Sequence, residues 1–118
     1  MDMANKEETP AAKLPCGITE EQLKGWKAQY GKDNIKVISL DHNGKLYEGI
    51  FRQPDFDVIC KAQKHLTNQE VFNAGLIYFL ECQLAIDEDV MKVHVVKAAF
   101  CLKLATLFEL KVADIKNL

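Results

Sequence analysis

The sequence lacks most of the features that identify a particular chemistry or compartment. Its 118 residues include only 3 prolines and 6 glycines, which excludes a low-complexity or collagen-like chain. The N-terminus has no apolar segment of the secretory type, and no uninterrupted apolar run is long enough to cross a membrane. With 15 basic and 17 acidic residues, the formal net charge of −2 gives no excess for binding nucleic acid or an anionic membrane. We therefore expect a cytoplasmic protein of one domain.

The 4 cysteines and 3 histidines match no known metal or redox motif. No Cys-x-x-Cys or His-Glu-x-x-His pattern occurs, and the spacing of cysteine to histidine along the predicted helices does not suit a catalytic thiol pair. Three cysteines fall among apolar residues of predicted helices, where we expect small buried side chains. These are Cys60, Cys82 and Cys101. Cys16 is expected to be a free, exposed thiol.

Patterns for phosphate, calcium and ester chemistry are also missing. The acidic run Asp87-Glu88-Asp89 lacks the alternating ligands and central glycine of an EF-hand loop. Gly44 and Gly49 are typical of a turn and a strand, and the only serine, Ser39, does not lie in a Gly-x-Ser-x-Gly elbow. The sequence therefore predicts no catalytic residue, no metal and no cofactor, and we expect that the protein is not an enzyme.

Residues 1–17 are polar and contain two of the prolines, so we predict a flexible tail followed by one domain over 18–118. Thr19 and Gln22 have the spacing of a capping box that starts a helix over 19–30. Gly31 is predicted to end this helix in a left-handed conformation.

A β-hairpin is predicted over 34–41 and 45–52. Asn43-Gly44 is a strong signal for a type I′ turn, and the flanking segments are rich in β-branched and aromatic residues. Because two strands alone are marginal in water, one face must lie on helices. The other face is covered either by the first helix or by another protein chain.

Three further helices are predicted. The first covers 55–66 after Pro54; the second covers 68–85 and starts at a capping box over Thr67–Glu70. The third covers 89–110 and is apolar around most of its circumference, and 111–118 either continue it or form a last turn. The fold class is α+β: an N-terminal helix, a β-hairpin and a bundle of about three helices.

The apolar stripes of helices 68–85 and 89–110 exceed what one hairpin can cover, which favours self-association or a groove for a partner. Tyr47 and Phe51 resemble a base-stacking pair, but no basic groove accompanies them, so packing in a core or interface is favoured. The candidate interaction surface consists of Trp26, Tyr30, Tyr47, Phe51, Phe72 and Leu76.

Four segments resemble small phage and prophage proteins over 18–118. In those proteins a helix ends in Trp-Lys-x-x-Tyr-Gly, here 26–31, and precedes a hairpin that closes with an aromatic-Arg-x-Pro step, here 51–54. A helix ending in apolar-x-x-Cys, here 79–82, precedes an acidic loop. The final segment, 107–118, is similar to their last helix.

Several such proteins look like tail assembly chaperones, which shield the tape-measure protein before the tail tube polymerises. The resemblance implies a non-enzymatic protein in the cytoplasm of a bacterial host. Its partner would be the tape-measure protein, another tail component or a second copy of itself. The alternatives are a self-assembling virion structural or accessory protein and, less favoured, a small nucleic-acid-binding or regulatory protein.

Overall fold

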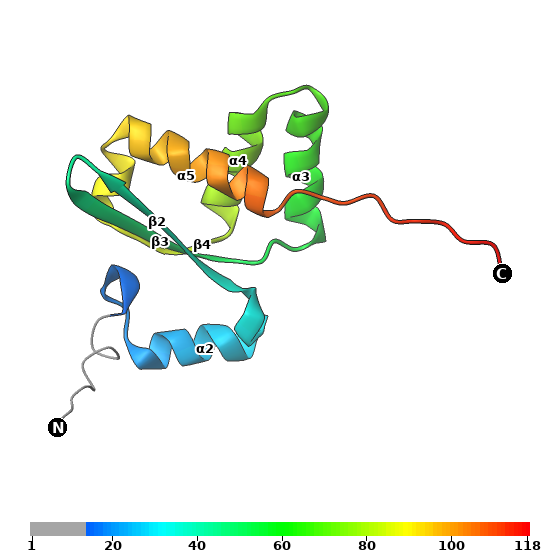
Figure 1. Cartoon of the computed structure of the whole chain (residues 1–118). Coiled ribbons are helices and arrows are strands. Elements are labelled where there is room, and N and C mark those ends of the chain that lie inside the picture. Colours follow the sequence, from blue (N-terminus) through cyan, green and yellow to red (C-terminus); the bar gives the residue numbers. More distant parts are fainter. Residues whose placement is uncertain (1–13) are drawn as a thin grey trace.

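The β-hairpin forms the centre of the fold. The structure is a computed structural model that describes residues 14–118, and it has the predicted α+β architecture (Figure 1). Strands β2 (Ile35–His42) and β3 (Lys45–Arg52) pair antiparallel, with Ile35 opposite Arg52 and His42 opposite Lys45. Asn43 and Gly44 both have positive φ, 53° and 80°, as a type I′ turn requires. The predicted hairpin is confirmed within one residue at each end.

A third strand, β4 (Gln83–Ile86), pairs antiparallel with β3 and gives the sheet order β2-β3-β4. The prediction of a helix over 68–85 is therefore wrong at its C-terminal end, because helix α4 (Val71–Glu81) stops before this strand. The apolar residues Leu84 and Ile86 continue a helical spacing in sequence. In the fold, the segment instead bonds to β3: Arg52 donates its N–H to the carbonyl of Cys82 at 2.9 Å.

The first predicted helix is confirmed as α2 (Glu20–Tyr30). Thr19 Oγ1 accepts the N–H of Gln22 at 3.0 Å, and the Gln22 side chain accepts the N–H of Thr19 at 2.9 Å, which completes the capping box. Gly31 has a positive φ of 96°, but its ψ of 139° is extended and not left-handed helical as predicted. A short 3-10 turn, η2 (Lys32–Asn34), follows it and leads into β2.

Helix α3 (Phe56–Thr67) begins after Asp55, whose carboxylate accepts the N–H of Val58 at 3.0 Å. The predicted capping box over Thr67–Glu70 is wrong. Thr67 is the last residue of α3, and its hydroxyl donates to the carbonyl of Gln63. Glu70 precedes α4 and bonds His65 through its carboxylate, Oε1 to Nδ1 at 2.8 Å.

The predicted helix over 89–110 is shorter in the structure. Residues Glu88–Met91 form a 3-10 turn, η3, and helix α5 covers His94–Leu107, because Val93 between them is extended, with φ −104° and ψ 100°. Residues 111–118 neither continue α5 nor form a last turn. After a turn at Phe108, the chain leaves the body as an extended segment (Figure 1). Phe108 starts this segment and is buried, with its ring 5.1 Å from that of Tyr78.

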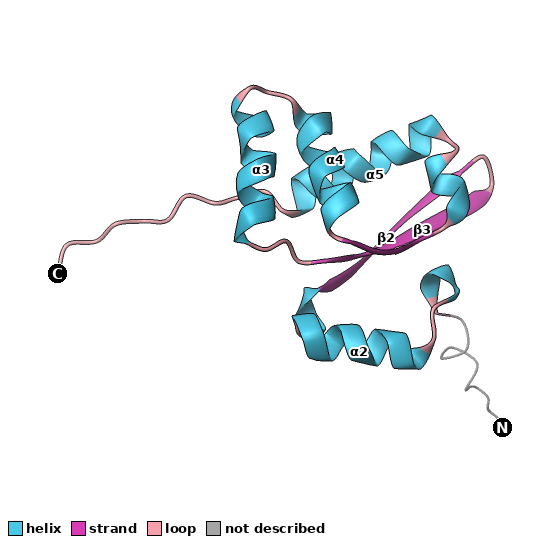
Figure 2. Ribbon diagram, turned by 180° about the vertical axis from the view of Figure 1, so that it is seen from behind, coloured by secondary structure: helices cyan, strands magenta, loops and turns pink. Residues whose placement is uncertain are grey.

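The sheet separates two layers (Figures 1 and 2). Helices α3, α4 and α5 cover one face, and their core centres on Phe51, which contacts the rings of Phe79 and Phe100. The opposite face carries Ile50, only 1% exposed, on the side of α2 and the 3-10 turn η1 (Pro15–Gly17). The turn η1 thus covers this face at β3, whereas Val37 on the same face of β2 remains 50% exposed. The first helix, one of the two covers that the sequence left open, contributes no buried residue.

The turn η1 lies against β3, so the predicted flexible tail over 1–17 does not extend through its last residues. Cys16 donates its S–H to the carbonyl of Glu48 at 3.3 Å, which fixes η1 on the central strand. The remaining part of that predicted tail, 1–13, lies outside the described residues. Within 14–118, no helix is both long enough and apolar enough to traverse a bilayer.

Candidate protein-binding surfaces

The structure does not bring the six predicted interaction residues together. Tyr47 and Phe51 point from β3 into the core and are 7% and 0% exposed, so they are removed from the candidate surface. Their alternation along β3 matches that of Gly49, which also faces the helical layer. The packing interpretation of these two aromatic residues is therefore correct.

Trp26 and Tyr30 lie half-buried on α2. The ring of Tyr30 lies 5.5 Å from the guanidinium carbon of Arg52, an arrangement that attaches the end of α2 to β3. Arg52 also donates to the carbonyl of Glu81 at 3.0 Å, so it links α2 to the end of α4. Tyr30 therefore contributes to the fold itself.

Phe72 and Leu76 lie one turn apart on α4 and line a shallow hollow between α4 and α5, about 440 Å³ in volume. Phe72 is 55% exposed, as expected of a contact residue. His94 and Lys97 of α5 border the hollow and Cys101 closes its floor. Of the six predicted residues, these two remain on an open apolar surface.

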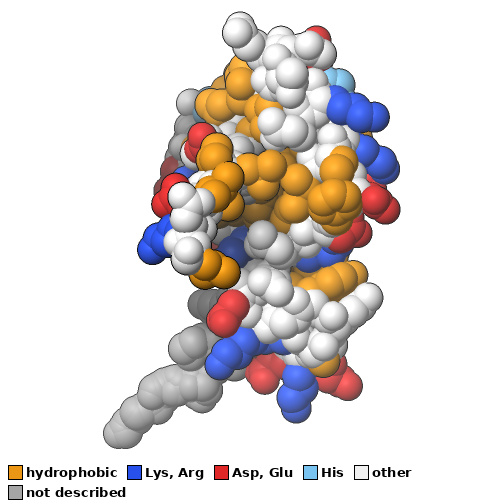
Figure 3. All heavy atoms as spheres, turned by 90° about the vertical axis from the view of Figure 1, so that its right-hand side faces the viewer, with side chains coloured by type: hydrophobic (Ala, Val, Ile, Leu, Met, Phe, Trp, Pro, Cys, Tyr) orange, Lys and Arg blue, Asp and Glu red, His pale blue; other side chains and the backbone are white. Residues whose placement is uncertain are grey.

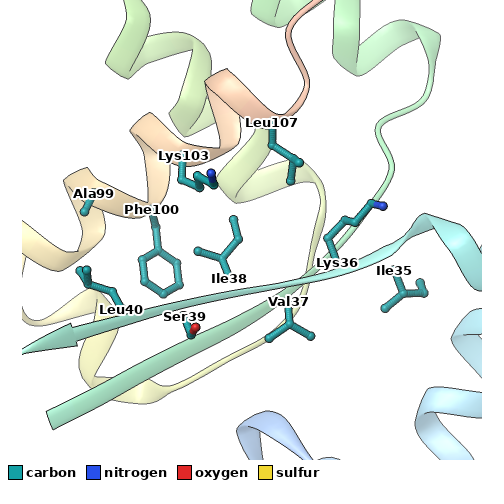
Figure 4. A pocket seen from close by; sticks show the side chains of 10 residues that line it. All are labelled: Ile35, Lys36, Val37, Ile38, Ser39, Leu40, Ala99, Phe100, Lys103 and Leu107. Atoms are coloured by element: carbon teal, nitrogen blue, oxygen red, sulfur yellow. The ribbon is translucent and has the colours of Figure 1, made fainter.

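A larger groove, about 530 Å³, runs between strand β2 and helix α5 (Figure 4). Leu40 and Ala99 lie at one end of it, and Lys36 and Leu107 lie at the other. Its remaining lining residues are Ile35, Val37, Ile38, Ser39, Phe100 and Lys103. None of the six predicted residues belongs to this groove.

Strand β2 forms one wall of the groove and is an edge of the sheet. An edge strand presents a row of backbone N–H and C=O groups that have no strand partner, and such edges pair readily with another extended segment. Beside these groups, Val37 and Leu107 expose 50% and 39% of their surface. The groove therefore combines a free hydrogen-bonding edge with apolar side chains.

The charge of the groove has one sign. Lys36 and Lys103 line it, and none of its lining residues within 14–118 is acidic. A segment that combines apolar residues with a carboxylate near the Lys36 end would match this lining in both hydrophobicity and charge.

A third hollow, about 390 Å³, lies where α5 ends. Leu66 and Val71 border it together with Ala105, and Glu109 and Leu110 of the extended segment lie at its edge. Figure 3 views the side from which this segment leaves, and apolar side chains gather across the middle of that face. The root of the segment thus lies on the α3 and α4 side of α5.

Burial and charge make the described thiols poor nucleophiles. Burial, with the charges of Asp87 and Glu48, raises the pKa of Cys16 to about 12. Burial likewise raises the pKa of Cys82 to about 11 and that of Cys101 above its ordinary value. Two expectations need correction, because Cys16 is half-buried and not exposed, whereas Cys60 is exposed and not buried.

Among residues 14–118, no group of three or more His, Cys, Asp and Glu side chains lies in a metal-binding arrangement.

The β2/α5 groove was not predictable from the spacing of apolar residues alone. Ile38 and Leu40 alternate along β2, which indicates a strand with one buried face. The sequence did not reveal β4, however, and without β4 it does not determine which strand of the hairpin is the edge.

Searches of protein-family models, curated proteins and solved structures each returned no match for this chain.

Proposed function

We propose that this chain is a non-enzymatic protein-binding module that holds an extended segment of another protein in the β2/α5 groove. The observation that carries the proposal is the open edge of β2 beside the apolar wall of α5. Added strands gain main-chain hydrogen bonds from an edge, and side-chain pockets beside the edge select the sequence. A helix next to the edge supplies such pockets here.

The sequence resemblance supports a sharper form of this proposal, a tail assembly chaperone-like factor of a phage or prophage, acting in the bacterial cytoplasm. A chaperone of this kind must cover apolar segments of a long partner before assembly. The groove and the α4/α5 hollow with Phe72 offer two apolar contact regions for that purpose. The proposed partner is a tape-measure protein or another tail component.

The alternative function is a self-assembling virion structural or accessory protein. The extended segment 108–118 favours it, because Val112 and Ile115 expose almost their whole surface and need a covering chain.

Co-expression with a tape-measure protein, followed by pull-down, tests the proposal. Lys103→Glu places a negative charge in the groove and should weaken binding about tenfold, whereas Lys64→Glu on the exposed surface of α3 should have little effect. Circular dichroism should show that both variants keep their helices. Failure of the unmodified chain to bind any tail component would remove the chaperone function. Mass spectrometry of purified virions separates the alternative, because a chaperone should be absent from the particle and a structural protein present.

A further inference from the structure

We infer that the β2/α5 groove binds residues 110–115 of a second copy of this chain, which add to β2 as an antiparallel strand. The inference rests on the proposed function, because it assigns an occupant to the same groove. It is carried by the sequence of the extended segment, by the lining of the groove and by the distance between them.

The extended segment 108–118 presents apolar side chains without cover. Val112 is 97% exposed and Ile115 is 94% exposed, although both are residues that favour strands and interiors. No helix or strand forms beyond Leu107. Phe108 and Glu109 still donate their N–H groups to carbonyls of α5, whereas the backbone of 110–118 is free to pair with a strand edge.

One antiparallel register matches the segment to β2 along the face toward α5. Residues of β2 on this face are Lys36, Ile38 and Leu40, since they lie opposite the core-facing positions of β3. Pairing Leu110 with Leu40 places Val112 beside Ile38 and Asp114 beside Lys36. Two apolar pairs are then followed by an ion pair, and Lys103 lies in the same groove.

The other face agrees with the same register. Ala113 falls beside Val37 and Ile115 beside Ile35, which covers a side chain of β2 that is 50% exposed in the free chain. A shift by two residues in one direction places Asp114 beside Ile38, and a shift in the other direction places Val112 beside Lys36. Both shifts put a charge against an apolar side chain, so the register is specified.

The strand must come from a second copy, because the segment cannot reach this position in its own chain. Phe108 is held in the core by Tyr78, and Leu110 lies at the hollow on the far side of α5 from the groove. Leu40 lies beside Ala99, eight residues back from Leu107, which is about 12 Å along the helix axis. The two residues from Phe108 to Leu110 span at most about 7 Å.

The contact joins two different surfaces, a groove on one copy and a segment on the next. The extent of assembly through such a head-to-tail contact increases with protein concentration. The contact closes when two copies exchange segments reciprocally or when several form a ring, and otherwise it gives an open chain of copies. Occupation of the groove by a sister copy would also place self-association in competition with binding of another protein.

Sedimentation velocity on the full chain over a range of concentrations tests the inference. Lys36→Glu and Asp114→Lys should each weaken self-association about three- to tenfold, since each places like charges opposite one another. The double variant Lys36→Glu/Asp114→Lys should recover most of the loss. Lys116→Glu, outside the paired residues, serves as the control and should leave association unchanged.

Deletion of 109–118 should give a monomer that binds a synthetic peptide of residues 108–118 in a saturable manner. A full chain that stays monomeric would overturn the inference, and so would association that survives the deletion, since that would indicate a contact through β2 itself. Loss without recovery in the double variant would also overturn it. If tape-measure binding persists in a strictly monomeric chain, only this inference fails. If the chain self-associates as described but binds no tail component, only the proposed function fails.

Discussion

Gly75 of α4 lies against the backbone of Cys101 in α5, so closely that a Cβ atom on Gly75 would overlap the Cys101 carbonyl. The absence of a side chain at this position is what allows the two helices to approach. Close approach brings Tyr78 and Phe79 of α4 and Phe100 of α5 into one fully buried cluster. The close packing of α4 on α5 therefore depends on glycine at position 75, where alanine would add a methyl group.

Gly75→Ala should destabilise the fold by about 3 kcal/mol, because the added methyl group meets backbone that cannot move aside. The measurement is urea denaturation followed by circular dichroism. Gly25→Ala is the matched control, since nothing lies within 4 Å of a Cβ at that position of α2. It should stabilise the helix by about 0.5–1 kcal/mol. Equal effects of the two substitutions would contradict the close packing of α4 on α5.

Thr19→Ala should weaken the start of α2 by about 1 kcal/mol, because it removes the hydroxyl that accepts the Gln22 N–H. Hydrogen exchange of the α2 amides, measured by NMR, should accelerate about fivefold while the amides of α5 stay protected. Thr106→Ala is the control, since its hydroxyl bonds a carbonyl within α5 and caps no helix. Acceleration throughout the chain would show that α2 does not open separately.

The described thiols should differ in their reaction with iodoacetamide at pH 8. Exposed Cys60 should react first, whereas Cys16, with its pKa raised to about 12, should remain largely unmodified. Asp87→Asn should accelerate Cys16, because it removes one of the charges that oppose ionisation. Peptide mass spectrometry over time reads out each site.

The same pKa shift sets a direction for stability at alkaline pH. The folded thiol of Cys16 holds its proton more tightly than an unfolded thiol with an ordinary value of 9.0. Stability should therefore fall as the pH rises above that ordinary value, and Cys16→Ser should reduce this fall. An unchanged alkaline slope in the variant would contradict the assignment to Cys16.

Glu70 should titrate below the ordinary range of a glutamate, since its bonds to His65 and Asn73 lower its pKa. Because the folded value is depressed, its contribution to stability is present above the unfolded pKa and is lost as the pH falls through the folded one. Carboxyl ¹³C NMR measures this directly. His65→Ala should raise the pKa of Glu70, and an unshifted titration in that variant would refute the pair.

Local signals in the sequence sufficed for the elements whose structure depends on adjacent residues. The type I′ turn at Asn43-Gly44 and the capping box at Thr19 are decided within four residues of chain, and both are present. The α+β class follows from these elements and the apolar spacing of α3, α4 and α5. An element whose structure depends on pairing with residues far away in the sequence, such as β4, could not be predicted from local signals.

Strand β4 is the clearest example of such a distant dependence. Gln83–Ile86 is half-buried along its length and pairs with β3, more than thirty residues earlier in the chain. Nothing in its own composition separates it from the end of an apolar helix. Because β4 was not predicted, the β2/α5 groove beside the opposite edge was not predicted either. Tyr47, assigned to the candidate interaction surface, is buried in the core beneath the helices.

Ile50 lies on the face of the sheet opposite Phe51 and is buried there, outside the apolar cluster that the helices cover. Residues of η1 and α2 share no buried side chain with the helical cluster. Release of η1 and α2 from the sheet would therefore leave the packing around Phe51 intact. Such local unfolding would expose the face of the sheet that carries Ile50, while the sheet and its three covering helices stay folded.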